Sequence, residues 1–260
     1  MDPLVWIILF TTLGSGVGVM AAGAVLLLPD RGLRRLLPRL VSFAIGSLLG
    51  AAFLGLLPHA LAGLDLEGVH ALTAVVLGGV LGFFLLEKLL IWRHCHMAHC
   101  EAHEPDAEAA HRAATGTIVL VGDAVHNLVD GVLIAAAFLT DVHLGIVTTF
   151  AVISHEIPQE VGDFALLLHS GYRRGRALFF NLLSSLATLV GGVTAYYALG
   201  AVEGLVPYVL ALAAASFLYI ALSDLLPDLH KRVEARATAE QLGLILTGVV
   251  VVYAVHSTLH

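Results

Sequence analysis

The chain has 260 residues, of which 58% are hydrophobic and only 13% are charged, and its formal net charge is -7. Soluble proteins average about 25% charged residues, so this composition excludes an ordinary soluble domain and predicts a polytopic membrane protein in a lipid bilayer. The 13 lysine and arginine residues are few and form no basic stripe, so we expect no nucleic-acid partner.

Apolar runs that are long enough to cross a bilayer follow one another along the whole chain. They predict an all-α membrane protein with eight transmembrane helices in a single domain, residues 1–260. The start of the chain, Met1-Asp2-Pro3-Leu4, lacks a basic n-region, so we expect the first run to be a retained helix. The predicted helices are residues 4–28, 39–63, 69–92, 114–139, 143–170, 176–200, 205–227 and 240–259.

The basic residues predict how the helices are oriented. All 13 lysines and arginines lie in or beside the loops that follow the first, third, fifth and seventh predicted helices. Lysine and arginine mark cytoplasmic loops, so these four loops face the cytoplasm. Both termini are then extracytoplasmic.

Two predicted helices, 114–139 and 143–170, carry ionisable side chains near their midpoints. A charge at that depth costs at least about 2.5–3.5 kcal/mol, and a bound cation offsets this cost. His126 and Asp130 are four residues apart and share one helix face, and two more pairs with this spacing follow in the second helix. Nitrogen and oxygen donors without thiolate suit Zn2+, Fe2+, Mn2+ or Cd2+. We predict a metal site between the fourth and fifth helices, with candidate ligands His126, Asn127, Asp130, His155, Glu156, Gln159 and Glu160.

A structural polar network that ties the two helices together is the alternative, although such a network rarely needs so many carboxylates. Polar residues also mark a path toward and away from the site. His59 lies near the outer end of the second helix and is either an entrance ligand or a hydrogen-bonded structural residue. Asp123, Asp163 and Asp224 lie toward the cytoplasmic side and predict an exit.

The region between the third and fourth helices, residues 93–113, is polar and rich in histidine and cysteine. Its two cysteines are five residues apart among histidines, a pattern that favours metal ligation over a disulfide. The tract either accepts or senses metal after passage, or it is a dispensable chelating linker. Its candidate ligands are His94, Cys95, His96, His99, Cys100 and His103.

The motif His126-Asn127-Leu128-Val129-Asp130-Gly131, followed by His155-Glu156-Ile157-Pro158-Gln159-Glu160-Val161-Gly162-Asp163, resembles the paired signature of the ZIP (Zrt/Irt-like) metal transporters. The second part is similar to the LIV-1 form, His-Glu-x-Pro-His-Glu-x-Gly-Asp, with Gln159 in place of the second histidine. The resemblance implies transport of divalent metal ions, zinc first, into the cytoplasm through the central site. Zinc would be the substrate rather than a resident cofactor.

Three other functions fit parts of the pattern. A cation/proton antiporter that exports metal uses similar helical sites, and a metal sensor that does not transport needs the same ligands. An intramembrane zinc protease needs His-Glu-x-x-His, and Gln159 replaces its second histidine, so we expect no enzyme. A homodimer is one open alternative for the oligomeric state. The short chain with almost no exterior loops predicts a prokaryotic plasma (inner) membrane.

Overall fold

The computed structural model describes residues 2–25, 27–97, 107–230 and 234–259, and all of its regular structure is helical. This confirms the predicted all-α class. Within the described residues, eight helical rods follow one another. Their bounds are α1 (Pro3–Val25), α2 (Asp30–Gly50) continued by η1 (Ala51–Leu56) and α3 (Leu57–Leu61), α4 (Leu66–Met97), α5 (Ala107–Thr140), α6 (Val142–His169), α7 (Arg174–Ala201), η2 (Glu203–Leu205) with α8 (Val206–Tyr219), η3 (Ile220–Leu225) and α9 (Leu226–Leu229), and α10 (Ala235–Leu259).

Seven of these rods are long and apolar enough to span a membrane. The eighth rod, α6, is long enough but is less apolar. Its 28 residues suffice in length, but the polar side chains from His155 onward lower its mean hydropathy. The start of α6 is set locally, because the Asp141 carboxylate accepts hydrogen bonds from the backbone N–H groups of His143 and Leu144 at 2.8 and 3.1 Å.

Some helix boundaries differ from those that the sequence predicted. The second rod begins at Asp30 rather than residue 39, because hydropathy marks only the apolar part of a helix that continues through Arg31–Arg35. In the same way α4 extends to Met97 and α5 begins at Ala107, so the predicted 93–113 loop is partly helical. His94, Cys95 and His96 belong to the last turns of α4. His99, Cys100 and His103 lie outside the described residues.

Two rods contain a wide π-helical turn directly before a proline. The amide of Leu57 donates to the carbonyl of Ala52, and the amide of Leu226 donates to the carbonyl of Ala221, five residues back in each case. Pro58 and Pro227 follow, and a proline has no N–H for the usual helical bond. The wide turn lets each helix continue past its proline.

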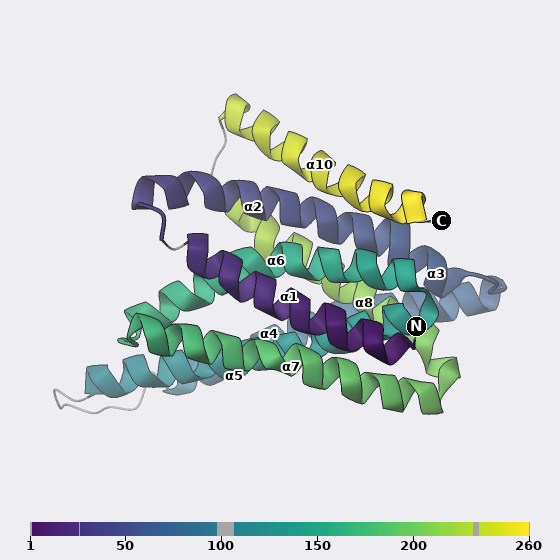
Figure 1. Ribbon diagram of the computed structural model, residues 1–260, viewed down its shortest axis with the longest axis horizontal. Helices are drawn as coiled ribbons and strands as arrows, with labels where there is room; N and C mark the ends of the chain where they lie inside the picture. The colour runs from purple at the N-terminus through teal and green to yellow at the C-terminus, as the bar shows by residue number, and fades with distance from the viewer. Residues whose placement is uncertain (1, 26, 98–106, 231–233, 260) are drawn as a thin grey trace.

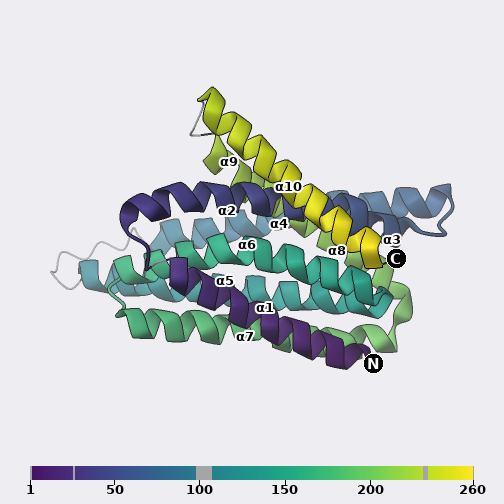
Figure 2. The same ribbon diagram turned by 45° about the horizontal axis from the view of Figure 1, so that its top comes forward.

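The rods run side by side, and both termini lie at the same end of the bundle, as an even number of passes requires (Figures 1 and 2). Helices α1, α5, α6 and α7 contact one another. Helix α2 packs against α6 and α10, and α4 packs against α8. Helix α10 lies at the edge of the bundle and crosses α2 at an angle (Figure 2).

A very close helix crossing brings α5 against α7 through glycines. A Cβ atom on Gly131 would lie 1.9 Å from the carbonyl oxygen of Thr188, and one on Gly191 would lie 2.1 Å from the carbonyl oxygen of Leu128. The two backbones are therefore in direct contact, as small residues permit between membrane helices. Helix α7 is thereby held against the polar face of α5.

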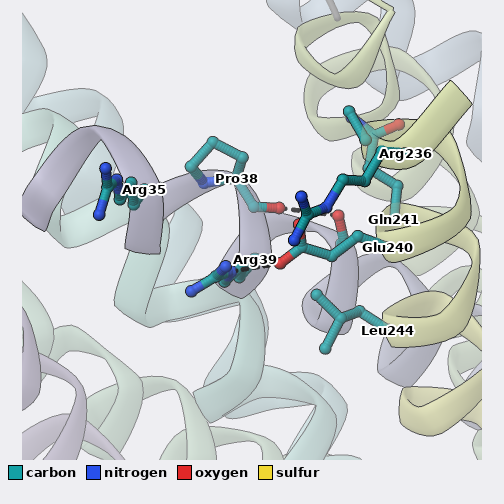
Figure 3. Close-up of a pocket in the computed structure, with 9 residues that line it drawn as sticks. Arg35, Pro38, Arg39, Arg236, Glu240, Gln241 and Leu244 are labelled. Atoms are coloured by element: carbon teal, nitrogen blue, oxygen red, sulfur yellow. Dashed lines mark hydrogen bonds and ion pairs between the residues drawn. The ribbon is translucent and has the colours of Figure 1, made fainter. Parts of the chain in front are cut away.

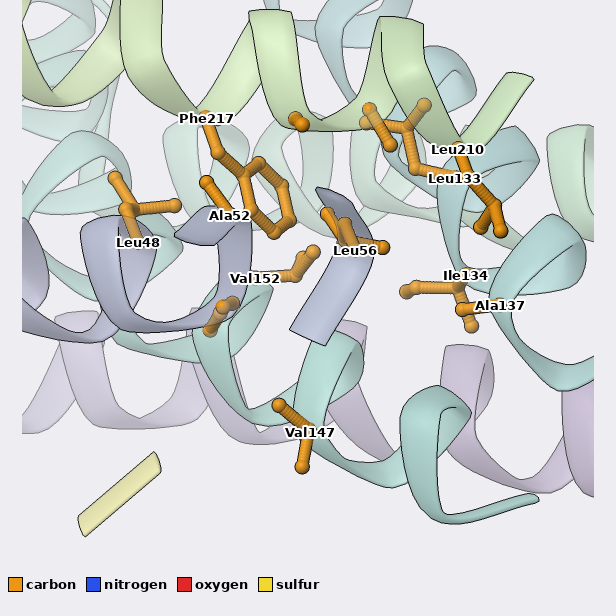
Figure 4. Packing of buried hydrophobic residues seen from close by; sticks show 14 of the residues in the cluster. Leu48, Ala52, Leu56, Leu133, Ile134, Ala137, Val147, Val152, Leu210 and Phe217 are labelled. Carbon is orange, nitrogen blue, oxygen red and sulfur yellow. The ribbon is translucent and has the colours of Figure 1, made fainter. Parts of the chain in front are cut away.

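Apolar side chains fill the space between α2, η1, α5, α6 and α8 (Figure 4). Leu133 and Ile134 on α5, Val152 on α6 and Phe217 on α8 all belong to this cluster. Other large apolar side chains face outward on the peripheral rods. The window of α4 that spans the membrane is only 11% buried, which fits a helix that faces lipid.

Candidate metal centre

Four donor atoms from α5 and α6 meet near the middle of the bundle. The Nε2 atoms of His126 and His155 lie 3.2 Å apart. Asp130 Oδ2 lies 3.5 Å from the first nitrogen and 3.3 Å from the second. Glu156 Oε1 lies 3.7 and 3.9 Å from the same two nitrogens. All four donor atoms lie within 4.8 Å of one another.

These spacings match those of a tetrahedral ion. Zinc bonds of about 2.0–2.2 Å to nitrogen and oxygen place neighbouring ligand atoms about 3.3–3.6 Å apart. The five separations given above, 3.2 to 3.9 Å, bracket this tetrahedral edge. The donor set is therefore arranged around a point that a divalent cation fits.

The environment of the four side chains favours a bound cation. His155 and Asp130 are fully buried, and Glu156 is 5% exposed. Both oxygens of Asp130 and Oε1 of Glu156 lack a hydrogen bond to any described residue. The Nδ1 of His155 lies 3.2 Å from the carbonyl of Ala151, so Nδ1 carries the hydrogen and Nε2 presents its lone pair to the site.

The apolar cluster borders the site on one side. The ring of Phe217 on α8 lies 6.1 Å from the ring of His155, between their centroids. Along α5 and α6, the buried residues Leu133 to Phe138 and Leu144 to Val152 lie between the site and the end of the bundle with both termini. The side chain of His126 is 24% exposed and is the most accessible of the four ligands.

Asn127 does not join the four donors. Its amide nitrogen donates to the carboxylate Oδ1 and the backbone carbonyl of Asp123 at 2.8 and 3.1 Å. Its amide oxygen accepts from Thr188 Oγ1 of α7 at 2.8 Å. Asn127 therefore links α5 to α7. Its amide nitrogen and oxygen are both used in these hydrogen bonds and are not directed at the two histidines.

Glu160 is not one of the four grouped donors. Glu160 is fully buried one turn beyond Glu156, and Gln159 is partly exposed. Asp123 is 4% exposed, and Ser184 of α7 donates a hydrogen bond to its Oδ2. Asp163 is half-buried two turns beyond His155.

The other predicted path residues lie near the ends of the bundle. His59 on α3 is half-buried, and its Nδ1 lies 2.8 Å from the carbonyl of Gly55. Its ring packs edge-on against His256 of α10 at 5.6 Å between centroids, a neighbour that sequence reasoning missed. Asp224 belongs to the π-helical turn η3, and its side chain lies outside the described residues.

The polar residues of α7 were not among the predicted site residues. Asn181, Ser184 and Thr188 are buried along the face of α7 that contacts α5 and α6. The available signal was their spacing of three, four and seven residues, which places small polar groups on one helix face.

A pocket of about 220 Å³ lies elsewhere, between α2 and α10 (Figure 3). Arg35 and Arg39 of α2 and Arg236 of α10 line it together with Glu240, which pairs with Arg39. Three guanidinium groups against one carboxylate repel a divalent cation, so this pocket is not a second metal centre.

Comparison with known proteins agrees with the resemblance to ZIP metal transporters. A family model described as ZIP zinc transporter matches residues 93–256. The zinc transporter ZIP13 of Homo sapiens is 33% identical over 257 residues, which cover 83% of this chain and 69% of that protein. The ZIP13 homolog of Drosophila melanogaster is 30% identical over 270 residues, covering 83% and 76%. The zinc transporter ZIP4 of Homo sapiens is 44% identical over 114 residues, which cover 44% and 18%.

The chain spans about two thirds of the length of the ZIP13 relatives from Pongo abelii, Mus musculus and Homo sapiens, between 65% and 69%. These relatives are animal proteins, so the predicted prokaryotic plasma membrane gains no support from them. The apolar rods and the family match agree on a multi-pass integral membrane protein.

Proposed function

The chain belongs to the ZIP zinc transporter family, and from that premise we propose that it carries divalent metal ions, zinc first, into the cytoplasm through the site between α5 and α6. The family consists of transporters, which supports the expectation that the chain is not an enzyme. The observation that carries the proposal is the tetrahedral spacing of the four donor atoms, three of which belong to buried residues.

The charge of the proposed ligand set suits a divalent ion in a membrane. Ionised Asp130 and Glu156 supply two negative charges, and His126 and His155 bind as neutral imidazoles. The complex with Zn2+ is then close to neutral, so the ion does not have to carry an uncompensated charge through the bilayer. Iron, manganese and cadmium ions fit the same nitrogen and oxygen donors and are alternative substrates.

We propose an outward entrance near His59 and an inward exit past Asp123, Asp163 and Asp224. The distribution of lysine and arginine supports a topology with both termini outside, which would place His59 near the outer end and the three aspartates toward the cytoplasm. Uptake is the direction that the family resemblance implies. The apolar cluster between the site and the end with the termini supports a closed outer side, while the buried polar residues continue toward the other end.

Alternating access then requires one helix group to move against another. Helices α1, α5, α6 and α7 contact one another, and the glycine crossing joins α5 and α7 closely. We propose that this group carries the site as one body. The rods α2, α4, α8 and α10 form the second group, and the apolar contacts of α2 and α8 with α5 and α6 form the surface along which the two groups move.

The test is zinc flux into proteoliposomes that contain a zinc-sensitive dye. We expect flux in the wild type and its loss in His155→Ala and Asp130→Asn. His143→Ala is the matched control, because His143 is on the same helix but near its outer end, with a side chain that is 33% exposed. Wild-type protein that binds zinc but gives no flux would contradict transport. Flux that persists in both site variants would refute the assignment of the site.

A further inference from the structure

The pocket between α2 and α10 carries an excess of positive charge (Figure 3). Arg35 and Arg39 line it from α2, and Arg236 lines it from α10. The carboxylate among its lining residues, Glu240, pairs with Arg39. Within the part of the chain that the structure describes, Arg35 and Arg236 form no ion pair. Three guanidinium groups and one carboxylate give the pocket a net charge of +2.

The way in which α2 and α10 cross creates this pocket. A Cβ atom on Gly46 would lie 2.0 Å from a backbone carbonyl oxygen of α10, and one on Gly248 would lie 2.5 Å from a backbone carbonyl oxygen of α2. The two helices therefore touch at these glycines, and they separate toward the ends at which both begin (Figures 1 and 2). The pocket lies between the separated ends. Its innermost lining residues, Ser42 and Leu244, precede the two glycines by one helical turn.

The lining of the pocket changes from charged to apolar along α10. Arg236 is in the first turn of the helix, Glu240 is in the next turn, and Leu244 closes the pocket. Further along, Leu246 and Val250 are more than half exposed. Only 11% of the window of α10 that spans the membrane is buried, so the helix faces lipid. A ligand in this pocket therefore meets guanidinium groups at one end and an apolar helix face at the other.

The charge and the size of the pocket suit a phosphate group. Guanidinium binds phosphate oxygens through two parallel hydrogen bonds. A phosphomonoester carries a charge of about -1.5 to -2 at neutral pH, which balances the +2 of the pocket. The volume of about 220 Å³ is several times the share of about 30 Å³ that a water molecule has in the liquid, so a phosphate group and the carbon atoms attached to it have room.

The general preference for basic residues at the cytoplasmic ends of membrane helices accounts for the number of arginines at this end of the bundle. It does not account for their meeting in one pocket. The Arg39–Glu240 pair joins residues that are 201 positions apart in the sequence. The first turn of α10 also lines the pocket through Ala237, and the positive end of the helix dipole adds to the attraction for an anion.

We propose that this pocket binds the phosphate headgroup of an anionic phospholipid and prefers a phosphomonoester lipid, such as phosphatidic acid, to a phosphodiester lipid. Basic pockets between membrane helices are suited to such headgroups. The acyl chains then lie along the apolar outer face of α10. The bound lipid joins the separated ends of α2 and α10, and this binding is independent of the proposed transport of metal.

The experiment titrates lipids onto the purified full chain in detergent and counts the bound lipids by native mass spectrometry. We expect phosphatidic acid to bind more tightly than phosphatidylglycerol, and phosphatidylcholine to bind most weakly. Arg35→Gln and Arg236→Gln should each weaken the binding of the first phosphatidic acid about fivefold, because each removes one positive charge from the pocket. Glu240→Gln should strengthen it, because it removes the negative charge.

Arg174→Gln is the matched control. Arg174 is an exposed arginine at the start of α7, at the same end of the bundle but outside the pocket, so its loss should leave the affinity unchanged. A second measurement separates a lipid from a soluble phosphate compound. Phosphatidic acid should raise the Tm of the wild type in detergent, and glycerol 3-phosphate, which has the same phosphomonoester without acyl chains, should raise it less.

Three results would overturn the lipid site. Equal affinities for phosphatidic acid and phosphatidylcholine would show that the pocket does not recognise the headgroup. An equal loss of affinity in Arg174→Gln and in the two pocket variants would mean that lipids are attracted by the whole basic end of the bundle. An equal rise in Tm with glycerol 3-phosphate would replace the lipid by a soluble phosphate compound.

Discussion

The glycine crossing between α5 and α7 predicts that Gly131→Ala damages the protein at a distance from any ligand atom. An alanine Cβ would lie 1.9 Å from the Thr188 carbonyl oxygen and 2.7 Å from the amide nitrogen of Gly192. Both neighbours are backbone atoms, so no side-chain rotation relieves the overlap. Non-bonded heavy atoms do not approach much closer than about 3 Å, so α7 must move away by about 1 Å or more.

The cost follows from what that movement breaks. Helix α7 supplies the hydrogen bonds from Thr188 to Asn127 and from Ser184 to Asp123. Overpacking costs about 1–3 kcal/mol, and each polar contact between membrane helices is worth about 0.6 kcal/mol. Alanine recovers about 0.5–1 kcal/mol of helix propensity. The net loss in the free energy of unfolding is therefore about 1–4 kcal/mol.

The assay is thermal unfolding of the purified protein in detergent, together with zinc flux in proteoliposomes. A loss of this size lowers Tm by about 2–16 °C. Gly122→Ala is the matched control, because Gly122 is on the same helix and a Cβ there meets nothing within 4 Å. The reasoning is refuted if Gly131→Ala unfolds at the same temperature as Gly122→Ala and transports zinc at the wild-type rate.

Three further predictions follow from the same contacts. Zinc uptake should weaken at acid pH, because metal binding requires deprotonated ligands and protons compete with zinc for the central site, and a zinc affinity that does not change with pH would contradict this ligand set. Thr188→Val removes the hydrogen bond to Asn127 and should lower the unfolding free energy by about 0.6–1 kcal/mol, with an unchanged Tm as the contrary result. Glu240→Gln removes the exposed ion pair with Arg39 and should change the unfolding free energy by at most about 1 kcal/mol, so a larger loss would show that the pair matters more than its exposure suggests.

Much of the candidate site follows from local spacing. His126 and Asp130 had to share a helix face because they are four residues apart, and His155 and Glu156 follow one another near the middle of α6. Charges at that depth need compensation, so a metal site was the natural prediction. The structure brings these four residues together.

The remaining members of the predicted ligand set could not be sorted by spacing. Asn127 and Glu160 lie on the same helices as the four donors, yet Asn127 turns toward α7 and Glu160 lies one turn beyond the centre. Which face of a helix meets which neighbour depends on the rotation of the helix about its axis. Hydropathy carries no information on that rotation when both faces are apolar or weakly polar.

The sequence by itself determined the helical class, the number of rods and the order in which they follow one another, because the thickness of a bilayer sets the length of each apolar run. It also determined which two rods hold the imidazoles. Only the tertiary structure decided that α7 packs against the polar face of α5, because that contact depends on Gly131 and Gly191, which let the two backbones touch. Close packing between helices far apart in the chain thereby holds Asp123 and Asn127 against Ser184 and Thr188 of α7, while His126 and Asp130 face the donors of α6.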